Sequence, residues 1–428
     1  MSVVTIEAVF GESDPELAGG LLGPDPGEGS TTFSFNVRGW AAPPPGAEIA
    51  AFRVLDGARI SAEVPPGAPP PGPDGEVEGA VGFEVLVRAI ELAPRFSIDV
   101  VAVLGDGSVR PLATVAGSRQ LLAVPRDPGI DPAMITTIGR SGSKWLARLL
   151  SCHPSILAFQ PLVFEPRVAT YWLTVLRELT APKSYLREIH TERWDQPRWW
   201  LGDGAVALPA PVDLGMADWL GNESVRQLAA VCQERIEAFY REVARRSGEQ
   251  EGVRYFAEKF LLDPVLLDLT SEVFPRAREL ILVRDFRDRL SSVFAWNEKR
   301  GDHGFGHDAE MSKAEYLVER VRVDAEELLD RWRRRGDAAL LVRYEDLILE
   351  PEATLARIFE YLGLPADEPA VGDVLARASE PDELLDSHRT VEDPRRTIGR
   401  WRNDLPAELA DESNQLLAPL LEGFGYEA

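Results

Sequence analysis

Cysteine is almost absent from this chain of 428 residues, which contains only Cys152 and Cys232. Two cysteines can build neither a disulfide framework nor, on their own, a zinc site. We therefore expect two buried thiols in a reducing compartment, and the chain is predicted to be cytoplasmic.

Long apolar runs are also missing. The first residues form no basic segment followed by an apolar one, so no signal peptide is expected. No apolar stretch reaches the length that spans a bilayer, so we expect no transmembrane segment. Basic residues are outnumbered, with 46 Lys and Arg against 70 Asp and Glu, and the formal net charge is -24. This balance excludes general affinity for nucleic acids or anionic membranes.

Lysine is scarce even among the basic residues. The chain has five, namely Lys144, Lys183, Lys259, Lys299 and Lys313. Against such an acidic background, a local basic cluster or a lysine in a glycine-rich loop is informative about function.

The first part of the chain differs from the rest in composition. It lacks lysine and has short apolar segments between Pro- and Gly-rich breaks, at 32–37, 48–54, 82–87 and 96–104. Short strand-like runs with regular turn signals predict a small all-β, sandwich-like domain over residues 1–122, followed by a linker at 123–131. No group of catalytic side chains stands out there, so we expect a binding or docking module.

Strands alternate with helices from Ala133 onward, the pattern of a parallel α/β sheet flanked by helices. The strands are expected at 133–138, 254–257, 279–283 and 338–342, and the helices at 143–151, 287–296, 315–334, 352–362 and 406–421. We assign residues 132–428 to this domain, with a helical insertion at about 160–250. That insertion holds five tryptophans, Trp172, Trp194, Trp199, Trp200 and Trp219. They either stack on sugar rings or, as is more common, form core.

A glycine-rich loop follows the first expected strand of this domain, with the sequence Gly139-Arg140-Ser141-Gly142-Ser143-Lys144. A buried strand, a turn with small residues and a helix start direct backbone N–H groups at an anion. It is not a Walker A loop, because Trp145 stands where that motif has its Mg²⁺-binding hydroxyl. An ordinary strand-to-helix turn is the alternative.

A second motif pairs Arg284, at the end of a buried strand, with Ser292 eight residues later on the next helix. A guanidinium and a hydroxyl at the carboxyl edge of a parallel sheet can hold a second phosphate. The alternative is that Arg284 and Asp285 merely cap the helix.

Two further motifs lie downstream. Tyr344-Glu345-Asp346 follows another expected strand, and Arg395-Arg396-Thr397-Ile398-Gly399-Arg400-Trp401-Arg402 places four arginines in an acidic tail. A run of charges is usually a solvated face. In this order and context, however, the four motifs together are far more specific than any one of them.

Together they resemble the sulfotransferases that use 3′-phosphoadenosine 5′-phosphosulfate (PAPS), particularly the bacterial and protein-tyrosine branches, over residues 132–425. The resemblance implies a P-loop-NTPase-like fold and a nucleotide site in which the loop binds the 5′-phosphosulfate. The residues it assigns to that group are Arg140, Ser141, Gly142, Ser143 and Lys144, with Trp145 beside them.

The resemblance assigns the 3′-phosphate to Arg284 and Ser292, and the vicinity of the adenine to Tyr344. The late basic loop contributes Arg395, Arg396, Gly399 and Arg400. That loop departs from the Arg-Lys-Gly-x-x-Gly pattern of the family, while its positive charge is kept.

The same resemblance points to residues for the transfer step. Arg140, Lys144 or Lys259 would neutralise the departing nucleotide, and Glu165 is the expected general base. His303 and His307 are the next candidates for the base, whereas His153 is expected to be a structural residue at a helix end.

The leading hypothesis is therefore a PAPS-dependent O-sulfotransferase that acts on a hydroxyl of a saccharide or secondary metabolite. No metal is required, because a sulfuryl group carries less negative charge than a phosphoryl group. Two alternatives stay open. One is a P-loop nucleotide kinase or NTPase, and the other is a nucleotide-binding protein without catalysis.

Overall fold

A computed structural model describes residues 2–11, 17–67, 79–159, 166–180, 218–248, 252–301, 303–381, 390–391 and 393–427. The chain divides into two compact units. The first comprises Met1–Asp127 and Trp172–Gln233, and the second comprises Pro128–Tyr171 and Glu234–Ala428. The divisions fall inside α2 (Val168–Leu179) and α5 (Ser224–Ser247).

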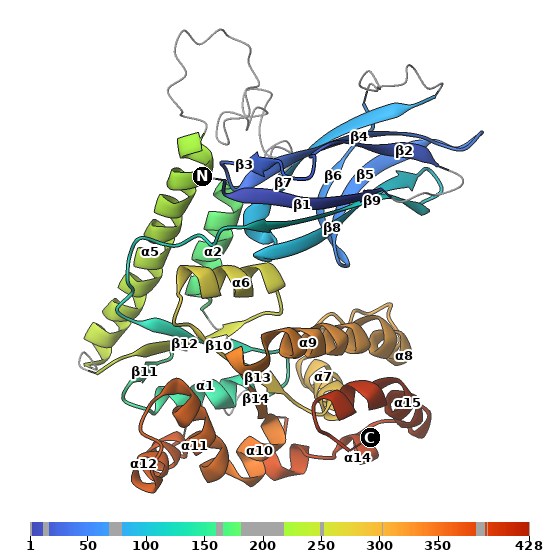
Figure 1. Ribbon diagram of the computed structural model, residues 1–428. Helices are drawn as coiled ribbons and strands as arrows, with labels where there is room; N and C mark the ends of the chain where they lie inside the picture. Colours follow the sequence, from blue (N-terminus) through green and yellow to red (C-terminus); the bar gives the residue numbers. More distant parts are fainter. Residues whose placement is uncertain are drawn as a thin grey trace. The chain divides into compact units, whose positions relative to one another are not determined.

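The first unit contains two antiparallel sheets (Figure 1). The six-stranded sheet has the order β3-β1-β9-β8-β5-β6. Its strands are β1 (Val4–Gly11), β3 (Gly29–Ser30), β5 (Ile49–Asp56), β6 (Arg59–Val64), β8 (Arg95–Leu104) and β9 (Val109–Arg119). The three-stranded sheet has the order β2-β4-β7, with β2 (Ala18–Gly23), β4 (Ser34–Ala42) and β7 (Val81–Arg88).

Aromatic side chains pack the two sheets against each other. Phe35 of β4 stacks on Phe96 of β8 with ring centroids 5.6 Å apart, and Phe52 of β5 stacks on Phe83 of β7 at 4.3 Å. Because these side chains alternate with more exposed ones along each strand, one face of each sheet is buried. The predicted all-β, sandwich-like region is confirmed.

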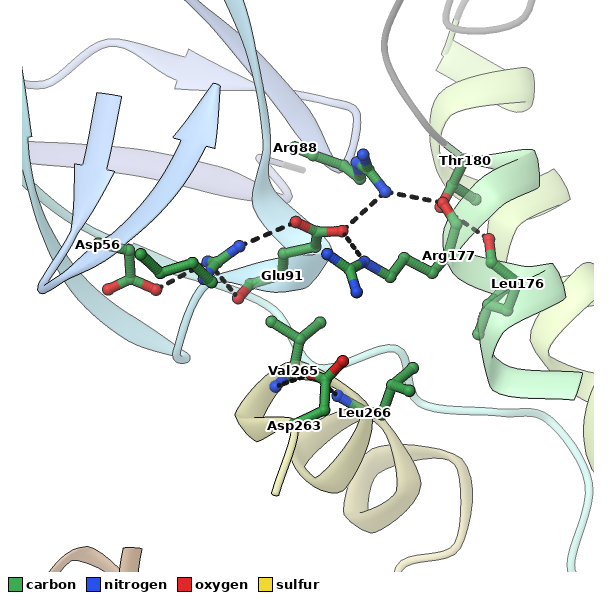
Figure 2. A network of polar contacts seen from close by, with 10 residues as sticks. Asp56, Arg88, Glu91, Leu176, Arg177, Thr180, Asp263, Val265 and Leu266 are labelled. Carbon is green, nitrogen blue, oxygen red and sulfur yellow. Dashed lines mark hydrogen bonds and ion pairs between the residues drawn. The ribbon is translucent and has the colours of Figure 1, made fainter. Parts of the chain in front are cut away.

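A buried carboxylate also ties this unit together. Glu91 follows β7, accepts from Arg59 Nη1 at 3.0 Å and Arg177 Nε at 2.6 Å, and forms an ion pair with Arg88 Nη1 at 2.7 Å (Figure 2). Three guanidinium groups around one carboxylate satisfy a charge that burial alone would make costly. These ion pairs form a network with a structural role.

The second unit is built on a parallel sheet of five strands in the order β11-β12-β10-β13-β14. The strands are β10 (Asp131–Thr136), β11 (Ile156–Leu157), β12 (Tyr255–Phe260), β13 (Arg278–Val283) and β14 (Ala339–Arg343) (Figure 1). This confirms the predicted parallel α/β fold. Strand β12 extends three residues beyond its predicted end and therefore contains Glu258 and Lys259.

Alternate residues of β13 point into two cores, which explains its unbroken apolar sequence. Leu280 and Leu282 pack with α1 (Ser143–Ser151), α11 (Pro351–Leu362) and α12 (Glu368–Ala378). Ile281 and Val283 pack with α7 (Phe286–Arg300), α9 (Arg322–Arg335) and α15 (Ala407–Gly423). The sheet is thus covered on both faces, as parallel sheets require.

The remaining helices of this unit come between these elements along the chain. They are α6 (Pro264–Val273), α8 (Lys313–Tyr316), α10 (Tyr344–Leu349) and α14 (Trp401–Asp404). The single helix predicted at 315–334 is in fact α8 and α9, joined by the π-helical turn Leu317–Val321. Within the described residues, no helix combines the length and apolar character needed to cross a membrane.

Candidate functional site

The loop between β10 and α1 has the backbone of an anion-binding turn. Arg140 and Gly142 both adopt left-handed conformations, with φ of 69° and 92°, and Gly142 is the N-cap of α1. The carbonyl of Gly142 accepts from Trp145 N at 3.0 Å and Leu146 N at 3.1 Å, which starts the helix. The turn therefore brings the positive end of α1 to the carboxyl edge of the sheet.

At two positions in this loop, neighbouring side chains leave room only for glycine. A Cβ on Gly139 would lie 2.4 Å from the Phe305 ring, and a Cβ on Gly142 would lie 2.3 Å from the Tyr344 ring. Arg289 fixes the start of the loop, because its Nε donates to the Gly139 carbonyl at 2.9 Å. The loop is held close to aromatic side chains from distant segments.

Arg140 reaches from this loop to α7. Its Nε donates to Ser292 Oγ at 3.1 Å, and its guanidinium lies 4.5 Å from the centroid of the Trp296 ring. Burial, together with the nearby charges of Arg284 and Arg400, lowers the pKa of Arg140 to about 10. Three arginines from distant parts of the sequence therefore share one neighbourhood.

Arg284 occupies the centre of that neighbourhood and is 4% exposed. Its Nη1 donates to the Arg140 carbonyl at 3.3 Å and its Nη2 to the Thr397 carbonyl at 2.7 Å. Its guanidinium lies 4.8 Å from the centroid of the Tyr344 ring. Arg284 thus connects the glycine-rich loop with the late basic loop.

The late basic loop is held by α7 and by Tyr344. Asp288 of α7 accepts from Gly399 N at 2.6 Å and from Trp401 N at 3.0 Å. The Tyr344 hydroxyl lies 3.1 Å from Thr397 Oγ1. The position of this loop is therefore set by contacts with two other segments.

The arginines of that loop differ in their surroundings. Arg400 is partly buried and is paired with Asp404 at 2.6 Å. Arg395 and Arg396 are exposed. Among the predicted basic residues of the loop, Arg400 is close enough to Arg140 to lower its pKa.

Several buried donors at this place have no hydrogen-bond partner within the described residues. They are Ser141 Oγ, Trp145 Nε1 and Arg284 Nε. Unpaired buried polar groups are rare and costly, so a ligand is the natural explanation. Hydroxyl, indole and guanidinium donors in a cluster of positive charge suit phosphate oxygens.

Lys259 lies on a different strand from the one that leads into the loop. Its strand β12 pairs with β10, and its position shares a face with Ala257, which packs into the core beneath α1. Lys259 and Lys144 are both partly buried. Alternation along the strand therefore directs Lys259 toward the face of the sheet on which α1 lies.

Glu258 points to the opposite face and was not predicted as a site residue. It is 3% exposed, accepts from Ala169 N at 3.0 Å and from Thr170 N at 3.2 Å, and binds the Tyr240 hydroxyl at 2.7 Å. Burial raises its pKa to about 7, and these hydrogen bonds limit the rise. Glu258 caps the start of α2.

The candidate bases have separate outcomes. Glu165 lies outside the described residues, so its role stays a prediction. His153 is buried, accepts from Ser155 N through Nδ1 at 3.1 Å and packs on Phe359, and burial lowers its pKa. These contacts are those of a structural residue.

The other histidines lie in the segment after α7. His303 is exposed, while His307 packs between the rings of Phe294 and Tyr316 at 5.4 and 5.2 Å. Burial, together with the nearby His303, lowers the pKa of His307. Three tryptophans of the predicted insertion, Trp194, Trp199 and Trp200, also lie outside the described residues.

The structure brings together Arg140, Ser141, Gly142, Arg284, Ser292, Tyr344, Gly399 and Arg400. Sequence reasoning missed Asp288, Trp296 and Phe305. Asp288 had a signal, because it is four residues before Ser292 on the expected helix and so shares its face. Phe305 also had one, since glycines flank it on both sides. No group of His, Cys, Asp and Glu side chains in the described part of the chain is placed to hold a metal ion.

Comparisons with known proteins agree with this geometry. A family model described as the sulfotransferase family matches residues 132–368. The chain is 25% identical over 179 residues to a protein-tyrosine sulfotransferase of Drosophila melanogaster, a match covering 39% of this chain and 34% of that protein. It is 25% identical over 154 residues to carbohydrate sulfotransferase 3 of Tetronarce californica, covering 34% and 35% of the two chains.

These matches span only about a third of the length of the two relatives. Among solved structures, the sulfotransferase domain of the olefin synthase from Synechococcus PCC 7002 is 23% identical, with a TM-score of 0.41. The match covers 72% of this chain and 100% of that one.

Proposed function

The chain belongs to the sulfotransferase family, whose model matches more than half of its residues, and we propose that it transfers a sulfuryl group from PAPS to an acceptor hydroxyl. One observation carries the donor assignment. Arg140, Arg284 and Arg400 converge beside a helix N-terminus, next to buried donors that lack partners in the described part of the chain. Such a cluster suits a ligand with phosphate groups at two positions.

Within this proposal, each donor phosphate has its own residues. Ser141, Ser143, Lys144 and the first turn of α1 bind the 5′-phosphosulfate, with Trp145 alongside. Arg284 and Ser292 bind the 3′-phosphate. Tyr344 lies near the adenine, and Arg395, Arg396, Gly399 and Arg400 close the site from the late loop.

The chain's own residues supply positioning and charge for the transfer. When bound, PAPS supplies a sulfuryl group whose bond to the nucleotide phosphate breaks as a bond to the acceptor oxygen forms. Arg140, Lys144 and Lys259 stabilise the negative charge that develops on the phosphate side. The hydroxyl proton passes to a general base, for which we propose Glu165. No metal is part of this scheme, because the transferred group carries little negative charge.

For the acceptor we propose a hydroxyl of a saccharide or secondary metabolite. One relative is named as a carbohydrate sulfotransferase, which supports a sugar. The antiparallel sandwich, of a kind that accompanies sugar-processing enzymes, supports it by analogy. We further propose residues 1–122 as an accessory domain, 123–131 as a linker and 132–428 as the catalytic domain. Two buried free thiols support a cytoplasmic location.

Calorimetric titration tests the donor assignment. We expect the protein to bind 3′-phosphoadenosine 5′-phosphate (PAP) without metal and not to bind ATP with Mg²⁺. The reverse pattern would favour a P-loop kinase or NTPase instead. Replacing Arg284 with Ala removes a buried charged donor and should weaken PAP binding at least about tenfold. The matched control is Arg276→Ala, at the opposite end of the sheet, where Arg276 pairs with Asp131.

A transfer assay tests catalysis. Labelled sulfate should pass from PAPS into a panel of glycans and phenols. If PAP binds but no acceptor in the panel is labelled, a nucleotide-binding protein without catalysis becomes the better description. Glu165→Gln should abolish transfer and leave PAP affinity unchanged, and transfer at the wild-type rate would remove its role as base.

A further inference from the structure

Asp288 has no place in the proposed contacts with the nucleotide, yet it binds the late basic loop on both sides of Arg400. We infer that Asp288 is a positioning residue that holds Thr397–Trp401 in place, and that it thereby sets the affinity for the 3′-phosphate. The inference rests on the proposed function, because it concerns the same nucleotide site.

The contacts of Asp288 all lead to one segment. Asp288 is 1% exposed and uses both carboxylate oxygens, with Gly399 N donating to Oδ2 at 2.6 Å and Trp401 N donating to Oδ1 at 3.0 Å. These two amides flank Arg400. A charge-assisted bond on each side of that residue fixes the course of the backbone through it.

The backbone of Gly399 and the side chain of Trp401 are also held in specific conformations. Gly399 has a φ of 69°, a backbone conformation that residues with a side chain rarely adopt. The Trp401 ring lies against the guanidinium groups of Arg287 and Arg402, at 4.4 and 4.5 Å. Asp288 thus holds the backbone of this segment, and its neighbour Arg287 contacts the Trp401 ring.

Asp288 also lies close in sequence to the two residues proposed for the 3′-phosphate. Ser292 follows it by one turn on α7, and Arg284 lies just before Asp285, the N-cap of that helix. Arg284 itself donates to the Thr397 carbonyl at 2.7 Å. Asp288 on α7 and Arg284 just before that helix therefore contact the same loop, and a shift of the loop would move the groups around the 3′-phosphate.

A neutral amide cannot replace this carboxylate. Asn has one acceptor oxygen, and its NH₂ group would face a backbone N–H that also donates. Removing the charge alone would have the opposite effect, because the remaining cations would attract every anionic ligand more strongly. The positioning role and a purely electrostatic role thus predict changes of opposite sign.

The test compares two ligands that differ only in the 3′-phosphate, PAP and 5′-AMP, by calorimetry on the full chain. For Asp288→Asn we expect the ratio of PAP to AMP affinity to fall by about tenfold, with AMP affinity changed less than about twofold. If Asn does not fold, Asp288→Glu carries the test, because it keeps the charge but displaces it, and the ratio should still fall.

The control is Glu279→Gln, which alters a buried carboxylate at the other end of β13 and should leave the ratio unchanged. An equal loss for both ligands would reduce Asp288 to a structural residue and overturn the inference. An unchanged or increased ratio would overturn it as well. If the wild-type protein binds no PAP, the proposed function fails first, and the inference fails with it.

Discussion

The buried carboxyl of Glu258 gives a stability prediction that the structure makes quantitative. It lies on β12, accepts backbone N–H groups at the start of α2 and binds the hydroxyl of Tyr240, which is itself fully enclosed. Replacing it with Gln keeps the size and most of the hydrogen bonding but removes the titration. The difference between wild type and Glu258→Gln therefore isolates one ionisation.

Burial raises the pKa of Glu258 from 4.5 to about 7. Between these values the folded state holds a proton that the unfolded state has released, so the folded state loses stability as pH rises through this window. At about 1.4 kcal/mol per pKa unit, the full loss is about 3 kcal/mol, most of it between pH 5 and pH 8. The Glu258→Gln variant should show no such loss of stability, because Gln does not titrate.

The assay is denaturant unfolding of both proteins at a series of pH values. We expect the unfolding free energy of wild type, relative to Glu258→Gln, to fall by about 2 to 3 kcal/mol from pH 5 to pH 8. Tyr240→Phe is the matched control, because losing one donor to the carboxylate should move the transition to higher pH. A difference that stays constant with pH would refute the reasoning.

Three further predictions follow from single contacts. Gly142→Ala forces a Cβ to within 2.3 Å of the Tyr344 ring at a left-handed φ, and should lower stability by about 1–3 kcal/mol and weaken PAP binding. A calorimetric scan and a titration that both match wild type would contradict this. Glu279→Gln breaks a buried ion pair with two arginines and should lower the unfolding free energy by about 3–5 kcal/mol, measured with denaturant. A loss no larger than that for a surface ion pair would argue against the network. Burial raises the pKa of Cys232 to about 11 and also raises that of Cys152, so both thiols should resist iodoacetamide at pH 8 until the protein unfolds. Rapid labelling of the folded protein would count against that burial.

Much of the fold followed from patterns that act over short distances. The unbroken apolar run of β13 predicted a strand buried on both faces, and Ile281 and Leu282 do pack into separate cores. The glycine-rich loop predicted a strand-to-helix turn, and α1 begins at Ser143 as expected. Local periodicity could not locate the end of β12, because Glu258 and Lys259 are poor strand formers that only pairing with β10 holds in the sheet.

Sequence alone determined which residues lie at the carboxyl ends of the strands, because in a parallel sheet those ends share one edge whatever the details of packing. This shared edge agrees with the resemblance to the sulfotransferases, which assigned Arg140, Arg284 and Tyr344 to one site. Tertiary structure decided what these residues touch. Arg140 meets Ser292 152 residues away, and Asp288 meets Gly399 111 residues away. Such contacts depend on how loops pack over the sheet edge, and no local pattern in the chain encodes that packing.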